Sequence, residues 1–177
     1  MNNLSGVRHL ALLRHAKSSW DDPTCSDHDR PLAPRGRRAA QLVREHLREL
    51  REPPTLVLCS SARRTQETFE AIAPALGDDL ELVVEPGLYG ASGGELLERI
   101  HELQDDATSV MVIGHNPGLE DLATMLAGSG AGDSLDRMAI KFPTAALAWL
   151  SVPVSWRELA PGGATLAAYV VPRELGG

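Results

Sequence analysis

The sequence predicts an α/β fold in which a mainly parallel sheet of about six strands lies between two layers of helices. Short apolar runs, typical of buried strands, alternate along the chain with segments whose apolar residues recur at helical spacing. Hydrophobic residues make up 43% of the 177 residues, which is enough for a sizeable core. Because no repeat, linker or low-complexity tract divides the chain, we expect a single domain over residues 1–177.

The first part of the chain predicts two strands and one long helix. Residues 6–13 suit a buried strand, and a segment rich in Asp, Ser and Pro follows as a loop. Pro34 suits the first turn of a helix. Apolar residues at helical spacing continue that helix, namely Ala39, Val43, Leu47 and Leu50. The pair Pro53-Pro54 ends it, and residues 55–59 are expected to form the second strand.

The rest of the chain continues the same alternation. We expect helices over residues 64–75 and 94–103, and a further helix with Asn116 as its N-cap and Pro117 at its first position. The turn-rich segment 127–134 is expected to end that helix. Strands are expected at 80–84, 109–113, 145–152 and 165–171. In an open sheet of this kind, ligands bind outside the carboxyl ends of the strands.

Composition and charge narrow the function classes. A formal net charge of −7 argues against general nucleic-acid binding, which needs a broad basic surface. The apolar runs are far shorter than the ~18–20 residues that span a bilayer. Without a visible signal peptide, we expect a cytoplasmic protein and no membrane partner. Cys25 and Cys59 are too few for a disulfide framework, and no metal-binding motif occurs, so no cofactor is expected.

Charge is unevenly distributed along the chain. Residues 1–64 carry 12 Lys and Arg against 7 Asp and Glu, whereas residues 65–177 carry 5 against 17. A local arginine surplus inside an acidic chain indicates a focused anion site. We nevertheless interpret most arginines of the helix near residues 35–51 as a solvated face.

Three predicted strand ends bring histidines and arginines to one edge of the sheet. The first strand ends at Arg14 and His15, the second is followed by Arg63 and Arg64, and the fourth ends before His115. Arginine is planar and permanently charged, and its donors match phosphate oxygens in pairs. A neutral imidazole nitrogen can attack phosphorus near neutral pH. The sequence therefore predicts phosphoryl transfer by a scheme that needs no metal.

Four segments of the chain resemble the histidine phosphatase superfamily, whose members have a phosphoglycerate mutase-like fold. The segments are LLRHAKSSW, DHDRPLAPRG, CSSARRTQET and VIGHNPGLE, in the family's order and spacing. The family's Arg-His-Gly tripeptide is Arg14-His15-Ala16 here, and the RHAKS variant suits the branch of small phosphohistidine phosphatases. The resemblance implies a hydrolase that works through a phosphohistidine intermediate.

The resemblance also implies roles for individual residues. His15 matches the nucleophile that becomes phosphorylated, and Arg14 matches a phosphate-binding arginine beside it. Arg64 matches the second phosphate arginine. His115 matches the second histidine, which binds the phosphoryl oxygens. Arg30 matches a further arginine that reaches the phosphate in the small branch.

The neighbours of these residues have simpler interpretations. Arg63 is interpreted as a surface residue. Trp20 either covers one side of the cleft or anchors its loop, and we favour the anchor. Lys17 and Ser18 either help to bind phosphate or belong to a solvated loop. His28 is either a salt-paired loop residue or a substrate contact, and we favour the former.

A proton-donating carboxylate, usual in members that hydrolyse phosphate esters, is not evident. Glu85 is one residue too far from the Tyr89-Gly90 pair, and loop-forming roles explain Asp21 and Asp22 equally well. An alkoxide leaving group needs an acid, which is worth ~10²–10⁴-fold in rate. The imidazole of phosphohistidine has a conjugate acid with a pKa of ~6.5 and leaves once solvent protonates it. We therefore predict a phosphatase that acts on phosphohistidine in a protein.

Two alternatives stay open. A phosphomonoesterase or mutase would act on a small phosphorylated metabolite with the same histidines and arginines. A phosphate-binding module would hold the anion without turnover. A cysteine-dependent phosphatase is disfavoured, because it needs an arginine six residues after Cys59, where Thr65 stands. The sequence indicates neither the oligomeric state nor the identity of the phosphorylated partner.

Overall fold

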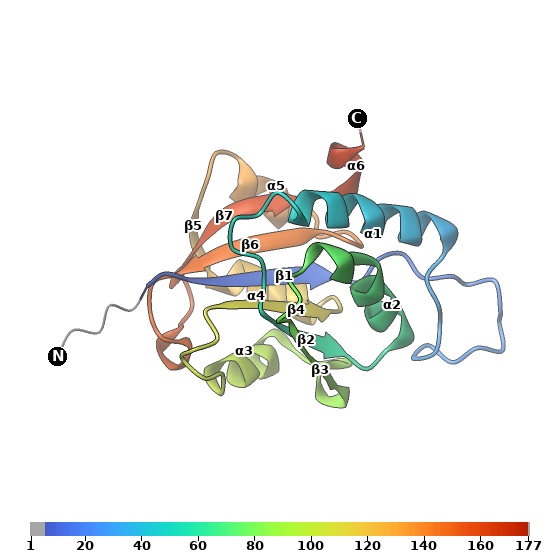
Figure 1. Ribbon diagram of the computed structural model, residues 1–177, viewed down its shortest axis with the longest axis horizontal. Coiled ribbons are helices and arrows are strands. Elements are labelled where there is room, and N and C mark those ends of the chain that lie inside the picture. Colours follow the sequence, from blue (N-terminus) through green and yellow to red (C-terminus); the bar gives the residue numbers. More distant parts are fainter. Residues whose placement is uncertain (1–5, 177) are drawn as a thin grey trace.

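A seven-stranded sheet forms the centre of the computed structural model, which describes residues 6–176 (Figure 1). The strands are β1 (Arg8–Arg14), β2 (Leu56–Ser60), β3 (Glu81–Glu85), β4 (Ser109–Gly114), β5 (Ala127–Gly130), β6 (Leu147–Val152) and β7 (Ala164–Val170). Their order across the sheet is β3-β2-β4-β1-β6-β7-β5. β6 is antiparallel to both of its neighbours, and the other neighbouring pairs are parallel. The expected mainly parallel sheet is thereby confirmed.

Helices cover both faces of the sheet. They are α1 (Pro34–Leu47), α2 (Arg63–Ile72), α3 (Gly93–His101), α4 (Gly118–Leu126), α5 (Ser134–Ile140) and α6 (Pro172–Leu175). Successive residues of β1 face opposite layers, as expected for a strand. Leu10 and Leu12 belong to a cluster with α3, α4 and α5, whereas Ala11 and Leu13 pack with α1 and α2. The expected three-layer α/β/α arrangement is confirmed, and burial on both faces explains the apolar strand sequences.

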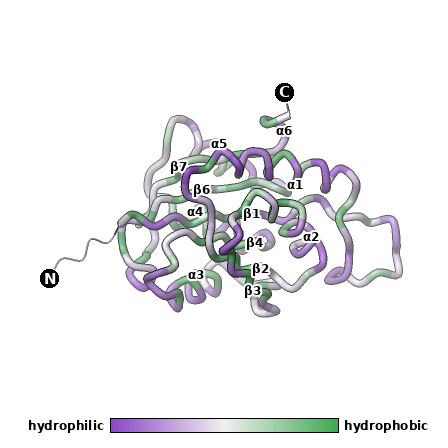
Figure 2. The backbone as a smooth tube through the Cα atoms, in the orientation of Figure 1, coloured by the Kyte–Doolittle hydropathy of each residue, from purple (hydrophilic) through white to green (hydrophobic). Residues whose placement is uncertain are grey.

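Local sequence explains how these helices begin and end. Pro34 stands in the first turn of α1, where its missing N–H is of no consequence, and hydrophilic and hydrophobic stretches alternate along this helix (Figure 2). α3 begins with a capping box made by Ser92 and Glu95. α2 continues into a 3₁₀ turn, Ala73–Ala75, which matches the predicted extent of that helix. Within residues 6–176, no helix is long and apolar enough to cross a membrane.

The turn-rich segment 127–134 contains a strand that the sequence does not predict. This is the edge strand β5, so the sheet has seven strands instead of about six, and the seven-residue helix α5 begins at the end of the segment. β5 reads Ala-Gly-Ser-Gly and lacks the β-branched residues that usually signal a strand. Its glycines serve a close approach, since a Cβ on Gly128 would lie 2.2 Å from the backbone oxygen of Gly162.

The helix after β4 begins later than predicted. Pro117 is the N-cap, the Asn116–Pro117 bond is cis, and α4 starts at Gly118. The prediction that Asn116 caps this helix was wrong, because its side-chain amide donates to the carbonyl of Phe142 at 2.9 Å instead. That contact connects the end of β4 to the segment that precedes β6.

The loop after β1 is fastened to the start of α1. The backbone N–H of Ala33 donates to the carbonyl of Lys17 at 2.8 Å. A Cβ on Gly36 would lie 2.1 Å from the same carbonyl oxygen, so only glycine allows this approach. Arg14 and Gly114 are register partners in β1 and β4. The residues that follow these two strands therefore lie side by side at the carboxyl edge of the sheet.

Candidate active site

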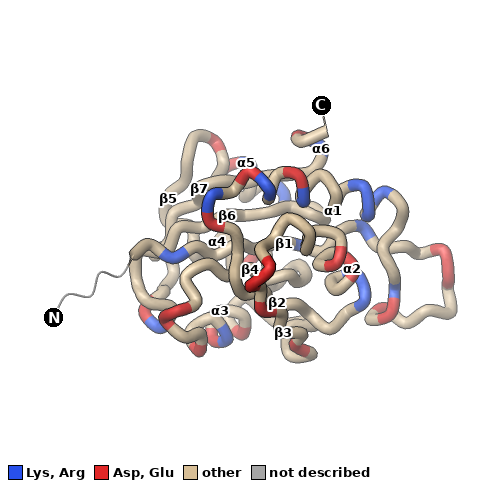
Figure 3. The backbone as a smooth tube through the Cα atoms, viewed as in Figure 1, with Lys and Arg blue, Asp and Glu red and all other residues tan. Residues whose placement is uncertain are grey.

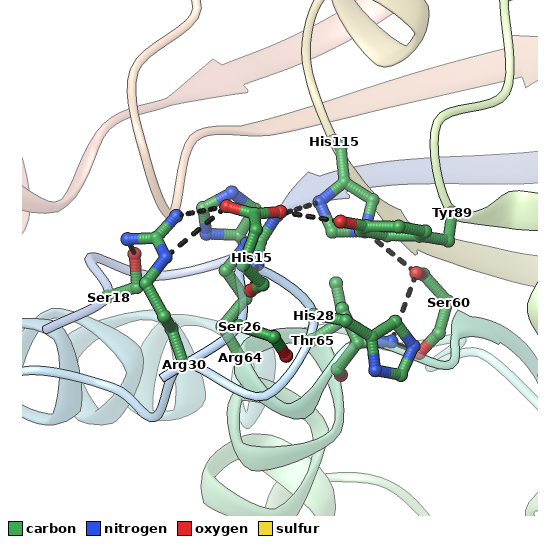
Figure 4. Close-up of polar contacts among 12 residues, drawn as sticks. His15, Ser18, Ser26, His28, Arg30, Ser60, Arg64, Thr65, Tyr89 and His115 are labelled. Carbon is green, nitrogen blue, oxygen red and sulfur yellow. Dashed lines mark hydrogen bonds and ion pairs between the residues drawn. The ribbon is translucent and has the colours of Figure 1, made fainter. Parts of the chain in front are cut away.

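Two histidines face each other at the carboxyl edge of the sheet. His15 follows β1 and His115 follows β4, and their ring centroids are 5.2 Å apart with the ring planes inclined by 52° (Figure 4). The parallel pairing of β1 with β4 produces this arrangement. The structure thus brings together the two imidazoles that the sequence singles out.

His15 has one ring nitrogen engaged and one available. Its Nδ1 lies 2.7 Å from the carbonyl oxygen of Ala16. Because a carbonyl only accepts, Nδ1 carries the proton and Nε2 keeps its lone pair. The residue is only 8% exposed, and burial lowers the pKa of His15 to about 3. The ring is therefore neutral near pH 7, with Nε2 free to act as a nucleophile.

Both ring nitrogens of His115 take part in hydrogen bonds. Its Nε2 lies 2.7 Å from Oγ of Ser60, and the guanidinium of Arg64 donates to its Nδ1 at 3.3 Å. Since a guanidinium only donates, Nδ1 is unprotonated and Nε2 donates to Ser60. Burial, followed by the charge of Arg64, lowers the pKa of His115 to about 4. Tyr89 packs edge-on against the ring, with the centroids 5.4 Å apart.

Two buried arginines share one carboxylate next to these rings. Arg64, in the first turn of α2, donates to the backbone carbonyl of Asp27 at 2.6 Å and to its carboxylate at 3.1 Å. Arg30, in the loop after β1, donates to the same carboxylate at 2.8 Å and to Oγ of Ser18 at 2.7 Å. The Arg30 guanidinium lies 3.6 Å from the ring centroid of Trp20, whose indole therefore covers the arginine although the side chain is largely exposed.

Arg14 is the third arginine near the two histidines. It donates to the carbonyl of Phe142 at 3.0 Å, and its charge contributes to the low pKa of both His15 and His115. The Nε atoms of Arg14 and Arg64 are buried and lack a hydrogen-bond partner among the described residues. Buried donors are normally satisfied. The terminal amino groups of a guanidinium are the donors that match phosphate oxygens in pairs.

Asp27 is a pocket residue that the sequence analysis missed. Besides the two arginines, the Tyr89 hydroxyl donates to its carboxylate at 2.6 Å. Hydrogen bonds from Tyr89 and then Arg30 hold the pKa of Asp27 well below its usual range, so this carboxylate is ionised at neutral pH. The Asp27–Arg30 spacing of three residues could have indicated an ion pair, but that signal is specific only within a helix.

The three carboxylates considered as proton donors lie in other contacts. Both oxygens of Glu85 accept hydrogen bonds from Arg99, at 2.7–3.0 Å. Asp21 is exposed, and the carboxylate of Asp22 accepts from the backbone and hydroxyl of Thr24. Among the described contacts, none joins these three carboxylates to the histidine pair.

Some of the remaining polar residues of the motifs contact other residues of the site, and others lie on the protein surface. His28 lies 2.9 Å from the hydroxyl of Ser61 through Nε2 and 3.3 Å from Asp29 through Nδ1. Arg63 is exposed and pairs with Glu67 on its own helix. The hydroxyl of Ser18 accepts a hydrogen bond from Arg30, and Lys17 is half-buried.

Cys59 is unsuited to nucleophilic catalysis. It is fully buried at the end of β2, and burial raises the pKa of its thiol to about 12. A thiolate is therefore inaccessible near neutral pH. Within residues 6–176, no group of three or more His, Cys, Asp or Glu side chains is placed to hold a metal ion.

The buried neutral His15 predicts a pH-dependent stability. Its pKa is about 3 in the folded chain and ~6.5 when unfolded, so between these values the unfolded chain binds a proton that the folded chain does not. Stability therefore falls as the pH drops, and His15 should account for about 2 kcal/mol between pH 7 and pH 5. In urea unfolding, His15→Ala should lose about 2 kcal/mol less than the wild type over this range. Equal losses in the two proteins would contradict the buried neutral ring.

Comparisons with known proteins agree with this geometry. The family model of the histidine phosphatase superfamily (branch 1) matches residues 10–139. Uncharacterized protein Rv1276c of Mycobacterium tuberculosis is 39% identical over 163 residues, which are 91% of this chain and 100% of that protein. The structure of the candidate phosphohistidine phosphatase SixA from Nakamurella multipartitia aligns with a TM-score of 0.82 at 30% identity, over 94% of this chain and 97% of that chain. The mycobacterial glucosyl-3-phosphoglycerate phosphatase Rv2419c, at 15% identity and a TM-score of 0.60 over 92% of this chain and all of the other, shares the fold alone.

Proposed function

We propose, from the premise that this chain belongs to the histidine phosphatase superfamily, that it removes the phosphoryl group of phosphohistidine on a protein through a covalent phospho-His15 intermediate. The observation that carries the proposal is the available Nε2 of His15, on a ring whose centroid lies 5.2 Å from that of His115, which Arg64 contacts in turn. The likeness at 30% identity to a chain described as a candidate phosphohistidine phosphatase supports the same substrate class.

In the first step, Nε2 of His15 attacks phosphorus in line with the bond to the substrate's imidazole nitrogen. The P–N bond breaks with its electron pair on the leaving imidazole, which takes a proton from solvent. Arg14, Arg30 and Arg64 hold the phosphoryl oxygens and balance their negative charge. A phosphoryl dianion favours the cationic form of His115, whose Nδ1 can then donate to a phosphoryl oxygen in place of its contact with Arg64.

In the second step, water attacks phosphorus and the His15–phosphorus bond breaks. The hydrogen bond from Nδ1 to the Ala16 carbonyl keeps a proton on the phosphorylated ring. The ring therefore leaves as neutral imidazole, a good leaving group, and the water's proton passes to phosphate or solvent. His15 returns to its starting tautomer, and inorganic phosphate is released.

The only carboxylate hydrogen-bonded to the pocket arginines, among the described residues, supports the choice of a P–N bond. Asp27 is ionised and therefore cannot donate a proton to a leaving alkoxide. An imidazole leaving group does not need that donor, because solvent can protonate it. Asp27 instead orients Arg30 and Arg64, with Tyr89 as a further support.

Steady-state kinetics with a phosphohistidine peptide and a panel of sugar phosphates test this substrate class. We expect kcat/KM to be at least about 10²-fold higher for the phosphohistidine peptide, since an ester lacks the acid help worth ~10²–10⁴-fold. A clear preference for an alkyl phosphate would instead favour a phosphomonoesterase or mutase. Binding of phosphate without turnover of either class would favour a binding module.

A further inference from the structure

A second cationic feature lies beside the proposed phosphoryl pocket. A cavity of about 640 Å³ opens between the start of α1, the segment 141–144 and the residues that follow β7. Its lining contains six cationic side chains and no acidic one. These cations are Arg14, Lys17, Arg35, Arg38, Lys141 and Arg173, and we call the cavity the basic groove.

The cations of the basic groove lack acidic partners among residues 6–176. Eight arginines elsewhere form ion pairs with Asp or Glu, and none of the groove cations is among them. In a chain of net charge −7, such a group of cations without ion-pair partners favours a local positive potential. Lys and Arg gather at the N-terminal end of α1 (Figure 3). Arg35 and Arg38 thus line a cavity, which the interpretation of this helix as a plain solvated face overlooks.

The basic groove adjoins the proposed active site, with which it shares Arg14. Arg14 lines the groove and directly precedes His15, and Lys17 follows two residues later. The opposite wall is attached to the same backbone, because the N–H of Ala145 lies 3.1 Å and 3.0 Å from the carbonyl oxygens of Arg14 and His15. A substrate whose phosphoryl group meets His15 would therefore have neighbouring atoms within reach of the groove.

The lining of the basic groove fits an acidic peptide segment better than a compact phosphate group. The exposed cations Arg35, Arg38 and Lys141 are spread over a helix and a loop instead of converging on one point. Between them lie apolar side chains, namely Ala39, Leu42, Val171 and Pro172. Asp and Glu on an extended peptide can reach separated cations, while the aliphatic parts of the peptide cover this apolar surface.

We propose that the basic groove binds acidic side chains that flank the phosphohistidine of the protein substrate, an inference that rests on the proposed function. Two phosphohistidine peptides of equal length test it, one with glutamates flanking the histidine and one with glutamines there. Wild type should turn over the glutamate peptide with about tenfold higher kcat/KM, since several exposed ion pairs, each of modest strength, add to its binding. The triple variant Arg35→Gln, Arg38→Gln, Lys141→Gln should lose this preference, yet hydrolyse free phosphohistidine as fast as wild type.

A second triple variant provides the matched control. Arg37→Gln, Arg51→Gln and Arg157→Gln remove the same charge from exposed arginines outside the groove lining, so the preference for the glutamate peptide should persist. Equal losses in both triple variants would overturn the proposal, because a diffuse field would then suffice. Absence of any glutamate preference in wild type would also overturn it.

A binding measurement distinguishes failure of this proposal from failure of the proposed function. Fluorescence anisotropy with labelled, unphosphorylated glutamate and glutamine peptides needs no turnover. If wild type fails to hydrolyse phosphohistidine, the proposed function fails, but selective binding of the glutamate peptide that the groove triple variant loses would still support the groove. Stronger displacement of the peptide by tripolyphosphate or an oligonucleotide than by an acidic peptide competitor would overturn the proposal in favour of a phosphate ligand.

Discussion

Replacing His15 by alanine is expected to abolish turnover. The substitution removes Nε2, the unengaged nitrogen of the ring that neighbours His115. Removal of a nucleophile costs enzymes at least about 10³-fold in kcat, and the arginines that remain cannot replace it. Phosphohistidine kinetics measure the effect. Activity within about tenfold of wild type would reject His15 as the nucleophile.

Two controls keep the interpretation of His15→Ala specific. His46→Ala changes a histidine on α1 and should leave kcat/KM unchanged. Binding of tungstate or phosphate to His15→Ala should persist, because Arg14, Arg30 and Arg64 remain. Persistent anion binding without turnover separates loss of the nucleophile from loss of the fold.

Replacing Arg64 by alanine is the second substitution with a large expected effect. Arg64 is 6% exposed and contacts both His115 and Asp27, so it connects three parts of the pocket. Charge-assisted contacts are worth ~1.5–3 kcal/mol each, and the variant loses more than one of them in the transition state. We expect kcat/KM to fall by about 10²–10³-fold.

The neighbouring arginine supplies the control for Arg64. Arg63→Ala removes an exposed guanidinium that pairs with Glu67 outside the pocket, so its activity should stay within about twofold of wild type. If Arg64→Ala itself loses only twofold, the guanidinium of this residue does not hold the phosphoryl group. Urea unfolding of both variants distinguishes a loss of catalysis from a loss of stability.

Much of the fold follows from the sequence because its signals are local. The buried strands β1, β2 and β4 have continuous apolar runs. The helices that cover them have apolar residues at regular spacing. β5 and α5 escape prediction because they are short, and Gly128 packs against Gly162, a contact that only the tertiary structure creates. The single domain expected over residues 1–177 stays a prediction.

The two histidines and the arginines could be placed at one edge because strand ends of a parallel sheet converge. Asp27 could not be found in this way, since it comes from a loop whose path the sequence does not determine. Its contacts with Arg30, Arg64 and Tyr89 join three separate segments of the chain. Long-range convergence of this kind also explains why the basic groove escaped the sequence analysis.

Trapping the covalent intermediate tests the central claim most directly. Rapid quench of the enzyme with a ³²P-labelled phosphohistidine peptide, followed by peptide mapping, reports where the phosphoryl group resides during turnover. We predict acid-labile, base-stable label on His15 that appears before inorganic phosphate and is absent in His15→Ala. Label on another residue, or release of phosphate without any labelled enzyme, would contradict a mechanism in which the His15 ring attacks phosphorus.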